Sequence, residues 1–318
     1  MAGDPQTSLG VGGWPPPALD PAGPFAGPIN ILSWVLFAMG AVVLALVLVA
    51  LFLALFGPRK WRSLLGDVRL VWIGGLAFPI VVLSALLIYG LSLTNHVDAD
   101  PQPGEMRVRV TGEMWWWRVA YLDPQGRELM RDANEIHIPT GRPVVFELEA
   151  ADVIHSFWIP RLGGKKDMIP GRRNVLRLQA DAPGLYKGQC AEFCGGPHAL
   201  MGLVVVAQDP AAFDAWRAAR IARASPPAGR GAEVFAAAGC GACHTVRGTA
   251  ANGVAGPDLT FVGARTTLGA GILPNNQGTL AGWIANSQSI KPGNRMPAYP
   301  VLNGEELRAV SAYLSGLR

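Results

Sequence analysis

Two long runs of apolar residues mark the first third of the chain. The run Ile31 to Phe56 has 26 residues and the run Leu70 to Leu93 has 24, and neither contains Asp, Glu, Lys or Arg. As α-helices they would be roughly 39 and 36 Å long, which exceeds the bilayer's hydrocarbon core of about 30 Å. Two buried helices of a large soluble core fit such uncharged runs less well. We therefore predict two membrane spans that form a hairpin over residues 29–97.

The charges that flank the runs predict the orientation of the hairpin. The connector between them holds four basic residues and one acidic residue, whereas the residues before the first run include no Lys or Arg. Because basic residues are retained on the cytoplasmic side, we expect the connector in the cytoplasm and both termini on the periplasmic or outer side. A cleavable signal peptide is disfavoured, since the first run is too long and no basic residue precedes it. The expected location is the cell (inner) membrane, as a multi-pass protein.

After the second span the pattern changes to short, β-like runs separated by clusters of Pro, Gly and Asp. The runs are Arg107–Val110, Trp115–Tyr121, Val144–Leu148, Asn174–Leu178 and Gly202–Val206. Several short strands at this spacing are typical of a β-sandwich or barrel of about 100 residues. We expect this β domain to cover residues 105–210.

The remaining segments predict a tail, a linker and a helical domain. Residues 1–28 are rich in Gly, Pro and Ala and are expected to be a disordered tail. Residues 211–228 indicate a helix followed by a Pro-rich linker. Residues 229–318 lack strand alternation and indicate a small α domain. Its helical patches are Ala232–Ala238, Leu280–Ser287 and Glu305–Leu317.

Composition and charge add only a little to this picture. Charged residues make up 16% of the chain, against about a quarter in a typical soluble protein, and the deficit lies in the two spans. The net charge is +4 without any Lys/Arg-rich run, so a nucleic-acid partner is not expected.

The last two of the four cysteines belong to a haem-attachment pattern. Cys240, Cys243 and His244 form C-x-x-C-H, in which two thioethers hold the porphyrin and the adjacent imidazole is the proximal iron ligand. Met296, the only methionine after Met201, is the expected second axial ligand. A thioether opposite an imidazole suits electron transfer rather than oxygen binding. Two disulfides, the usual alternative for four extracytoplasmic cysteines, do not suit this spacing.

The first two cysteines lie in a short segment rich in metal-binding side chains. This segment holds Cys190, Cys194, His198 and Met201, and His155 precedes it by 35 residues. Two thiolates on one loop can each bridge two copper ions, with His155 and His198 as terminal ligands of different metals. Met201 and the backbone carbonyl of Glu192 are candidate weak ligands. A Cys₂His₂ zinc site and a Cys190–Cys194 disulfide are the alternatives, and the β-rich setting with its trailing methionine favours copper.

At this point the motifs resemble a known family. The spans, the segment His155 to Pro160 (H-S-F-W-I-P) and the Cys190 to Met201 loop closely resemble subunit II of haem–copper cytochrome c oxidases. The C-x-x-C-H domain resembles the cytochrome-c-fused, caa-type members. The resemblance covers about residues 30–318. It implies a multidomain membrane protein: a two-helix transmembrane hairpin, a cupredoxin-like β-barrel with a dinuclear CuA centre over residues 105–208, and an all-α class I cytochrome c domain.

The resemblance also implies roles for single residues. Carried over to this sequence, the copper ligands are His155, Cys190, the Glu192 carbonyl, Cys194, His198 and Met201. The Glu192 carboxylate would also bind a non-redox magnesium at the interface with subunit I. Trp115, the first of three consecutive tryptophans, would be the residue at which electrons arrive, and Trp116 and Trp117 are expected to be ordinary strand residues. The Pro257 carbonyl would accept a hydrogen bond from the His244 imidazole. His137 belongs to no motif and is expected to be structural.

One position departs from the family pattern. Members often have a Glu in the second span, three residues before a Trp, at the mouth of a proton channel. Aligning on Trp72 places Arg69 there. We therefore expect proton delivery to begin elsewhere.

The function that the resemblance implies is electron delivery within a cytochrome c oxidase. Electrons would pass from reduced cytochrome c through the covalent haem and CuA to haem in subunit I, where O2 is reduced to water with proton translocation; subunit III is a further expected partner. No residue here resembles a catalytic acid, base or nucleophile. Two alternatives share the same motifs: the corresponding subunit of a CuA-containing nitric oxide reductase, and a membrane-tethered electron shuttle.

Overall fold

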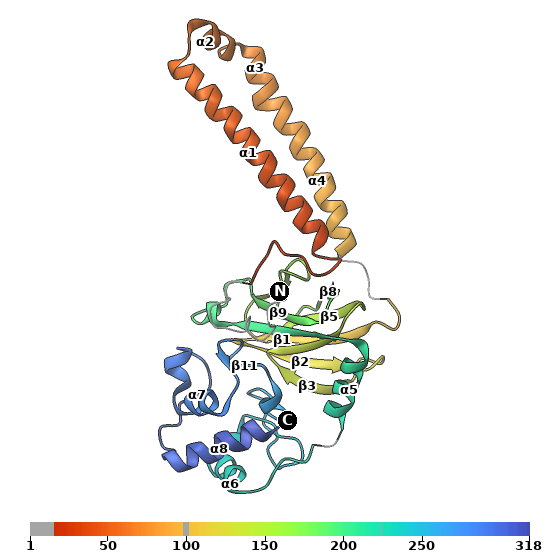
Figure 1. The fold of residues 1–318 in the computed structure, drawn as a ribbon, viewed down its shortest axis with the longest axis vertical. Helices are drawn as coiled ribbons and strands as arrows, with labels where there is room; N and C mark the ends of the chain where they lie inside the picture. Colours follow the sequence, from red (N-terminus) through yellow and green to blue (C-terminus); the bar gives the residue numbers. More distant parts are fainter. Residues whose placement is uncertain (1–15, 98–101, 223) are drawn as a thin grey trace, which may run out of the picture. The chain divides into compact units, whose positions relative to one another are not determined.

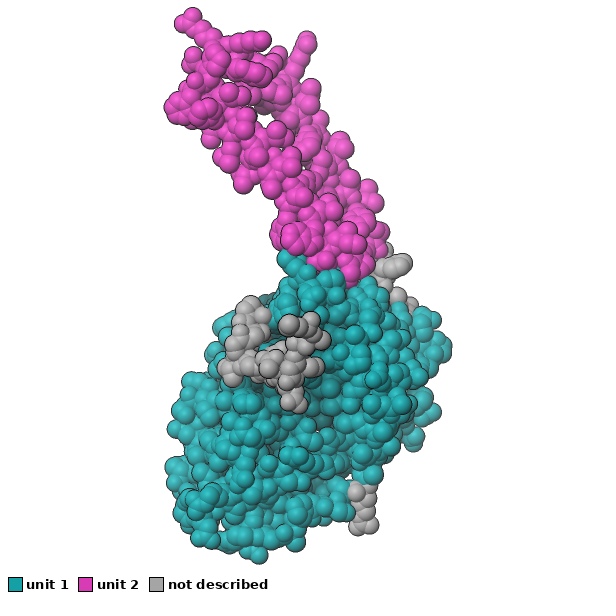
Figure 2. Space-filling view, viewed as in Figure 1, with its two compact units in different colours: residues 1–26, 100–318 teal, residues 27–99 magenta. Residues whose placement is uncertain are grey.

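The structure, a computed structural model, describes residues 16–97, 102–222 and 224–318. The chain divides into two compact units, Gly27–Ala99 and the remainder, which are coloured separately in Figure 2. Residues 1–15, which make up much of the tail expected to be disordered, lie outside the described residues.

The described end of the tail differs from the expectation of disorder. The Ala22 amide donates to the Arg161 carbonyl at 2.8 Å, and the Ala22 carbonyl accepts from the Asp181 amide at 3.0 Å. Asp20 pairs with Arg161 at 2.9 Å, and Ala26 is buried. These backbone bonds fix residues 16–26 on the β domain.

The first predicted domain is a helical hairpin whose two long arms run in opposite directions (Figure 1). Its elements are α1 (Gly27–Phe56), α2 (Arg59–Leu65), α3 (Val68–Trp72), the π-helical turn η2 (Ile73–Ala77) and α4 (Phe78–Val97). Two helices, Gly27–Phe56 and Val68–Leu93, are long and apolar enough to cross a membrane. No residue in the most apolar 18-residue stretch of either helix is buried. A helix that is apolar on all sides and does not pack into a protein core is suited to a lipid environment. The prediction of two apolar N-terminal helices is confirmed.

The β domain is a sandwich of two five-stranded sheets. Its strands are β1 (Met106–Glu113), β2 (Trp116–Leu122), β3 (Glu128–Ala133), β4 (Glu135–Pro139), β5 (Val144–Ala150), β6 (His155–Trp158), β7 (Lys166–Met168), β8 (Asn174–Leu178), β9 (Gly184–Cys190) and β10 (Gly202–Gln208). The strand orders are β3-β2-β1-β5-β8 and β4-β10-β9-β6-β7. Alternate side chains fill the space between the sheets, and Trp117, Phe146 and Phe157 are the largest that are fully buried. The predicted β domain is therefore present.

Strand ends at one margin of the second sheet position the predicted metal ligands. Strand β6 begins at His155 and β9 ends at Cys190, and the two strands pair in antiparallel register with Phe157 opposite Cys190. Strand β10 begins immediately after Met201. The loop between β9 and β10 is closed by a bond from the Cys190 amide to the Met201 carbonyl at 2.9 Å. Residues 35 positions apart in the sequence thus meet because neighbouring strands bring their ends together.

The C-terminal domain is helical, as predicted. It contains α6 (Arg230–Ala237), the short turns η4 (Cys240–Ala242) and η5 (Val262–Ala264), the two-stranded pair β11 (Thr267–Leu268) and β12 (Leu273–Pro274), α7 (Gln277–Ile290) and α8 (Gly304–Gly316). Capping boxes at Asn276 and Asn303 begin α7 and α8. Buried side chains from α6, α7 and α8 form one core. Helix α5 (Pro210–Ile221) precedes this domain and packs Phe213 and Trp216 near the β domain.

Candidate metal and haem sites

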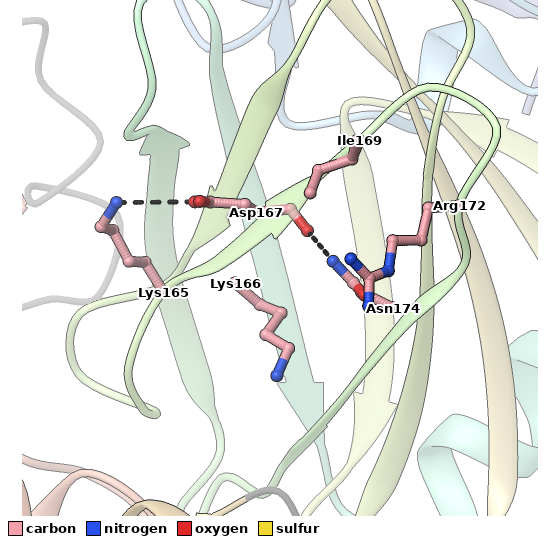
Figure 3. A pocket seen from close by; sticks show the side chains of 6 residues that line it. All are labelled: Lys165, Lys166, Asp167, Ile169, Arg172 and Asn174. Atoms are coloured by element: carbon pink, nitrogen blue, oxygen red, sulfur yellow. Dashed lines mark hydrogen bonds and ion pairs between the residues drawn. The ribbon is translucent and has the colours of Figure 1, made fainter.

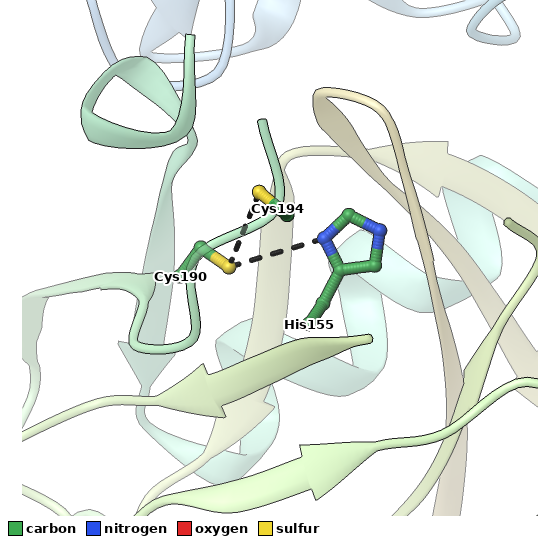
Figure 4. Close-up of side chains that lie close together, drawn as sticks. All are labelled: His155, Cys190 and Cys194. Atoms are coloured by element: carbon green, nitrogen blue, oxygen red, sulfur yellow. Dashed lines mark hydrogen bonds between the residues drawn. The ribbon is translucent and has the colours of Figure 1, made fainter. Parts of the chain in front are cut away.

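Two cysteines and a histidine form a compact cluster at the margin of the β-sandwich (Figure 4). The ligand atoms of His155, Cys190 and Cys194 all lie within 4.8 Å of one another, and all three side chains are buried. The two Sγ atoms are 3.8 Å apart, far longer than the ~2.05 Å of a disulfide bond. The Cys190 Sγ lies 3.9 Å from His155 Nδ1. The disulfide alternative does not describe this pair.

The other predicted copper ligands surround the same two sulfur atoms. Cys194 Sγ lies 3.5 Å from His198 Nδ1 and 3.8 Å from Met201 Sδ. Cys190 Sγ lies 3.2 Å from the Glu192 carbonyl oxygen. The two imidazoles therefore approach different sulfur atoms, as terminal ligands of two bridged metals would. The methionine and carbonyl are two donors beyond the four that a tetrahedral zinc site uses, and soft sulfur with imidazole suits copper.

The His155 ring is held by a hydrogen bond from its Nε2 atom and by close packing against the backbone of a glycine. Its Nε2 donates to Asp152 Oδ1 at 2.9 Å, which leaves Nδ1 directed at the thiols. The second carboxylate oxygen of Asp152 accepts from the Met114 amide at 2.8 Å. A Cβ on Gly112 would lie 2.7 Å from the ring, so only glycine fits there. Asp152 and Gly112 were not identified from the sequence, because neither belongs to a local motif.

The two thiols do not ionise alike. The hydrogen bond from Cys194 lowers the pKa of Cys190 to about 4, while the neighbouring Cys190 thiolate raises the pKa of Cys194 far above its ordinary value. Ionisation of one thiol of the pair therefore opposes ionisation of the other. A bridging metal pair needs both thiolates, so metal binding would displace the remaining thiol proton.

Trp115 touches the ligand loop directly. Its indole Nε1 donates to the Cys194 carbonyl at 2.8 Å, and a Cβ on Gly195 would lie 3.0 Å from the ring. The two tryptophans that follow behave as predicted for strand residues. Trp117 is fully buried in the sandwich, and Trp116 stacks under the Arg118 guanidinium at 4.7 Å.

Glu192 extends from the ligand loop towards a basic surface pocket. Its carboxylate is half-exposed and lies 3.9 Å from Lys165 Nζ. Lys165 is one of the residues around a pocket of about 380 Å³ (Figure 3): Lys165, Lys166, Asp167, Ile169, Arg172 and Asn174. In the described parts of the chain, no group of three His, Cys, Asp or Glu side chains within metal-binding distance includes Glu192.

The C-x-x-C-H residues lie on and after the turn η4. The His244 amide donates to the Cys240 carbonyl at 3.0 Å. The His244 Nδ1 donates to the Pro257 carbonyl at 2.7 Å, which is the bond expected from the resemblance and which leaves Nε2 for a metal. Burial lowers the pKa of His244, and so favours the neutral imidazole that binds iron. A Cβ on Gly256 would lie 2.6 Å from this ring.

Met296 lies against the core that the first haem cysteine also borders. Met296 and Cys240 are both partly buried at the same cluster of core side chains, and Cys243 is exposed. The Met296 Sδ accepts a hydrogen bond from the Trp283 indole at 3.2 Å. Its carbonyl accepts from Ser287 Oγ at 2.9 Å and from Gln288 Nε2 at 2.7 Å. The donor set, with two cysteines, an imidazole and a thioether in one domain, fits a haem c.

Polar contacts join the β domain to the helical domain. Arg265 Nε donates to Asp132 Oδ1 at 2.7 Å, and both side chains are less than 10% exposed. The Thr266 amide donates to Glu135 Oε2 at 2.7 Å. The other oxygen of Glu135 accepts from His137 Nε2 at 2.9 Å. His137, expected to be structural, thus supports this contact between the domains.

We expect acid to weaken the Glu135 contact. Burial alone would raise the pKa of Glu135, but the hydrogen bonds from His137 and Thr266 outweigh it and hold the pKa below 4.5. A carboxyl group with a lowered folded-state pKa stabilises the folded state above its unfolded pKa, and this is lost as the pH falls through the folded value. The protection of the Thr266 amide against hydrogen exchange should therefore fall below about pH 4.5.

The variant E135Q should lack this part of the pH dependence, because its amide does not titrate. E128Q, at the start of β3 in the other sheet of the same domain, is the matched control. Glu128 pairs with Arg131 at the surface, so this variant should behave as the wild type. Equal acid sensitivity of Thr266 in E135Q and the wild type would contradict the assignment.

Fold and sites together define a membrane protein with a cupredoxin-like domain and a cytochrome c domain. Residues 119–208 match the family described as cytochrome c oxidase subunit II, periplasmic domain, and residues 228–318 match the cytochrome c family. These two families imply copper and haem.

Relatives show which family the whole chain belongs to. It is 37% identical over 322 residues to cytochrome c oxidase subunit 2 of Alkalihalophilus pseudofirmus, covering 95% of this chain and 90% of the relative. It is 33% identical over 259 residues to cytochrome c oxidase subunit 2 of Bacillus subtilis, covering 75% and 71%. The chain belongs to the cytochrome c oxidase subunit 2 family, whose members are components of the haem–copper oxidase, an oxidoreductase. The family resemblance drawn from the motifs is confirmed.

One part of the chain is similar to a solved structure. The periplasmic domain of subunit II of cytochrome oxidase from Bradyrhizobium japonicum is 30% identical, with a TM-score of 0.35, and covers 38% of this chain and 95% of that one.

Proposed function

We propose that this chain receives electrons for a cytochrome c oxidase and passes them to the catalytic subunit. Electrons from a reduced cytochrome c arrive at the C-terminal domain, cross to the cupredoxin-like domain and leave to subunit I, where O2 is reduced to water with proton translocation. The observation that carries this proposal is the cluster of two thiols and four further donors around them, with each imidazole directed at a different sulfur.

The residues of the cluster fit a dinuclear copper centre of the CuA type. Cys190 and Cys194 would bridge the two ions, His155 and His198 would be terminal ligands, and Met201 with the Glu192 carbonyl would bind weakly. When bound, such a centre supplies a one-electron carrier whose charge is shared between two metals. The buried cysteines exclude water from it, and Asp152 fixes the His155 ring, so the ligands need to move little when the charge changes.

The residues of the C-terminal domain fit one covalent haem c. Cys240 and Cys243 would form its thioether links, and His244 and Met296 would be its axial ligands. Pro257 orients the imidazole through its carbonyl. Trp115 is the residue through which electrons reach the copper site, since its indole is bonded to the loop that carries Cys194.

The family and the charge of the connector support a proposal for the surroundings of the subunit. Both termini lie on the periplasmic or outer side, and the two apolar helices cross the lipid bilayer. Subunits I and III are the partners within the membrane, and cytochrome c is the donor. The Glu192 carboxylate would bind magnesium at the interface with subunit I, in competition with its ion pair to Lys165.

Metal and haem analysis of the oxidase complex, purified from membranes, tests this proposal. We expect about two copper ions and about one covalent haem for each copy of this chain, with an EPR spectrum of a mixed-valence copper pair. The complex should consume O2 with reduced cytochrome c. Copper near zero would overturn the assignment, and reduction of nitric oxide in place of O2 would identify a nitric oxide reductase. Purification without a haem-containing subunit I would indicate a tethered shuttle.

A further inference from the structure

A buried lysine joins the two cofactor-binding domains. Lys291 lies at the C-terminal end of α7 and is 3% exposed. Its Nζ donates to the Trp115 carbonyl at 2.6 Å and to the Gly269 carbonyl at 3.1 Å. Lys291 and Gly269 belong to the helical domain, whereas Trp115 belongs to the β domain.

On the helical side, Lys291 is bonded to the segment that ends at Met296. The Asn294 side chain donates from Nδ2 to the Lys291 carbonyl at 2.8 Å and accepts at Oδ1 from the Met296 amide at 2.9 Å. Gly269 is connected to Met296 as well. A Cβ on Gly269 would lie 2.9 Å from the ring of Trp283, and this indole donates to the Met296 sulfur. Lys291 is thus linked to Met296 in two ways: through Asn294, and through Gly269 and Trp283.

On the other side, the bonded carbonyl belongs to the residue that touches the copper-ligand loop. The Trp115 indole donates to the Cys194 carbonyl at 2.8 Å. A continuous series of bonds thus runs from Met296 through Asn294, Lys291 and Trp115 to Cys194.

A second contact from the same segment is weaker. Arg295 donates to Asp152 Oδ2 at 3.2 Å, but its side chain is 60% exposed, and exposed ion pairs contribute little to stability. The buried lysine differs in kind. Burial lowers its pKa to about 7, yet an amine donates hydrogen bonds in both protonation states. Leaving such a buried donor unpaired is costly, so the two carbonyls are strongly held.

We propose that Lys291 is a positioning residue for electron transfer, which fixes the Met296 segment of the haem domain against Trp115 of the copper domain. The inference rests on the proposed function, since it assumes that both sites carry their cofactors. It implies that electrons cross between the domains at one constant geometry, without a prior search by the haem domain. The rate of electron transfer between two sites depends on the distance and the bonded path between them, so a buried contact that fixes both can govern transfer.

The test compares K291M with the wild type in the complete oxidase complex. Haem c is photoreduced, and its reoxidation by the copper centre is followed in buffers of increasing viscosity. The wild-type rate should not depend on viscosity. K291M keeps the apolar length of the side chain but donates no hydrogen bond, so its rate should fall below that of the wild type and should depend on viscosity.

Two further variants separate positioning from general damage. K291Q retains two N–H donors and should recover most of the rate. K187M removes a lysine from β9, in the β domain, and should match the wild type. The copper EPR spectrum and the haem spectrum should be unchanged in K291M, while hydrogen exchange should accelerate in residues 112–118 and 291–296 of the full chain.

The outcomes distinguish this inference from the proposed function. A wild-type complex without copper or covalent haem would overturn the proposed function itself. With both cofactors present, a wild-type rate that depends on viscosity would overturn the role of Lys291. So would a K291M variant with the wild-type rate and wild-type exchange in both segments.

Discussion

Replacing Cys194 with serine should remove the copper centre and nearly all oxidase turnover. The Cys194 sulfur lies within 4 Å of Cys190 Sγ, His198 Nδ1 and Met201 Sδ, so it is the donor that the other ligands share. A serine hydroxyl is a hard ligand that stays protonated at neutral pH and does not bridge copper. We expect C194S to lose the mixed-valence EPR signal, with turnover reduced on the order of 100-fold or more.

The haem should survive this change, because Cys240 and Cys243 lie in another domain. Trp115 should also keep its contact, since it is bonded to the backbone carbonyl of residue 194 and not to the sulfur. A199S is the matched control: it places a hydroxyl at an exposed position of the same loop and should retain copper. A C194S complex with two copper ions and the wild-type EPR spectrum would show that Cys194 is not a bridging ligand.

Replacing Arg265 with methionine should open the contact between the two domains. The substitution leaves the Asp132 carboxylate buried without its partner, and breaking one side of a buried ion pair costs about 3–5 kcal/mol. Hydrogen exchange measures the free energy of such local opening. In R265M the free energy of local opening should fall by about 3–5 kcal/mol for the amides of residues 132–135 and 265–266.

The exposed pair Arg217–Asp214 on α5 provides the control for this variant. Its charged atoms are 3.2 Å apart at the surface, so R217M should change local stability by less than about 1 kcal/mol. The double variant D132N/R265M should regain part of the loss, because no buried charge remains unpaired. Unchanged exchange in R265M would mean that the ion pair does not hold the domains together.

The candidate metal and haem ligands could be proposed from the sequence because most of them lie close together along the chain. Cys190, Cys194, His198 and Met201 occupy one short loop, and C-x-x-C-H occupies five residues. The two apolar helices were predictable because uncharged apolar runs of such length are typical of helices that cross a membrane. Strand β7 was not predicted, since it has three residues, two of them charged. Much of β9 also carries no clear alternation, with Gly at two positions and Lys between them.

The residues that join the domains could not be predicted in this way. Lys291 meets Trp115 across 176 positions and Arg265 meets Asp132 across 133, and no periodicity encodes such distances. A faint signal existed for Lys291, which is the only lysine of residues 229–318 and lies five positions before Met296. The ordered end of the tail was missed for a similar reason: a Pro/Gly-rich composition does not reveal that backbone groups elsewhere will bind it.

Two glycines, Gly112 and Gly256, have a shared consequence for how this subunit can vary. Each lies against the face of one metal-directed imidazole, with less than 3 Å available for an added carbon, although one belongs to a β-sandwich and the other to a helical domain. Any side chain added at either position would have to displace the imidazole, so the constraint on both glycines is one of volume. The two domains, which differ in fold, thus share one device: close packing of a glycine backbone against an imidazole restricts the position of the ring.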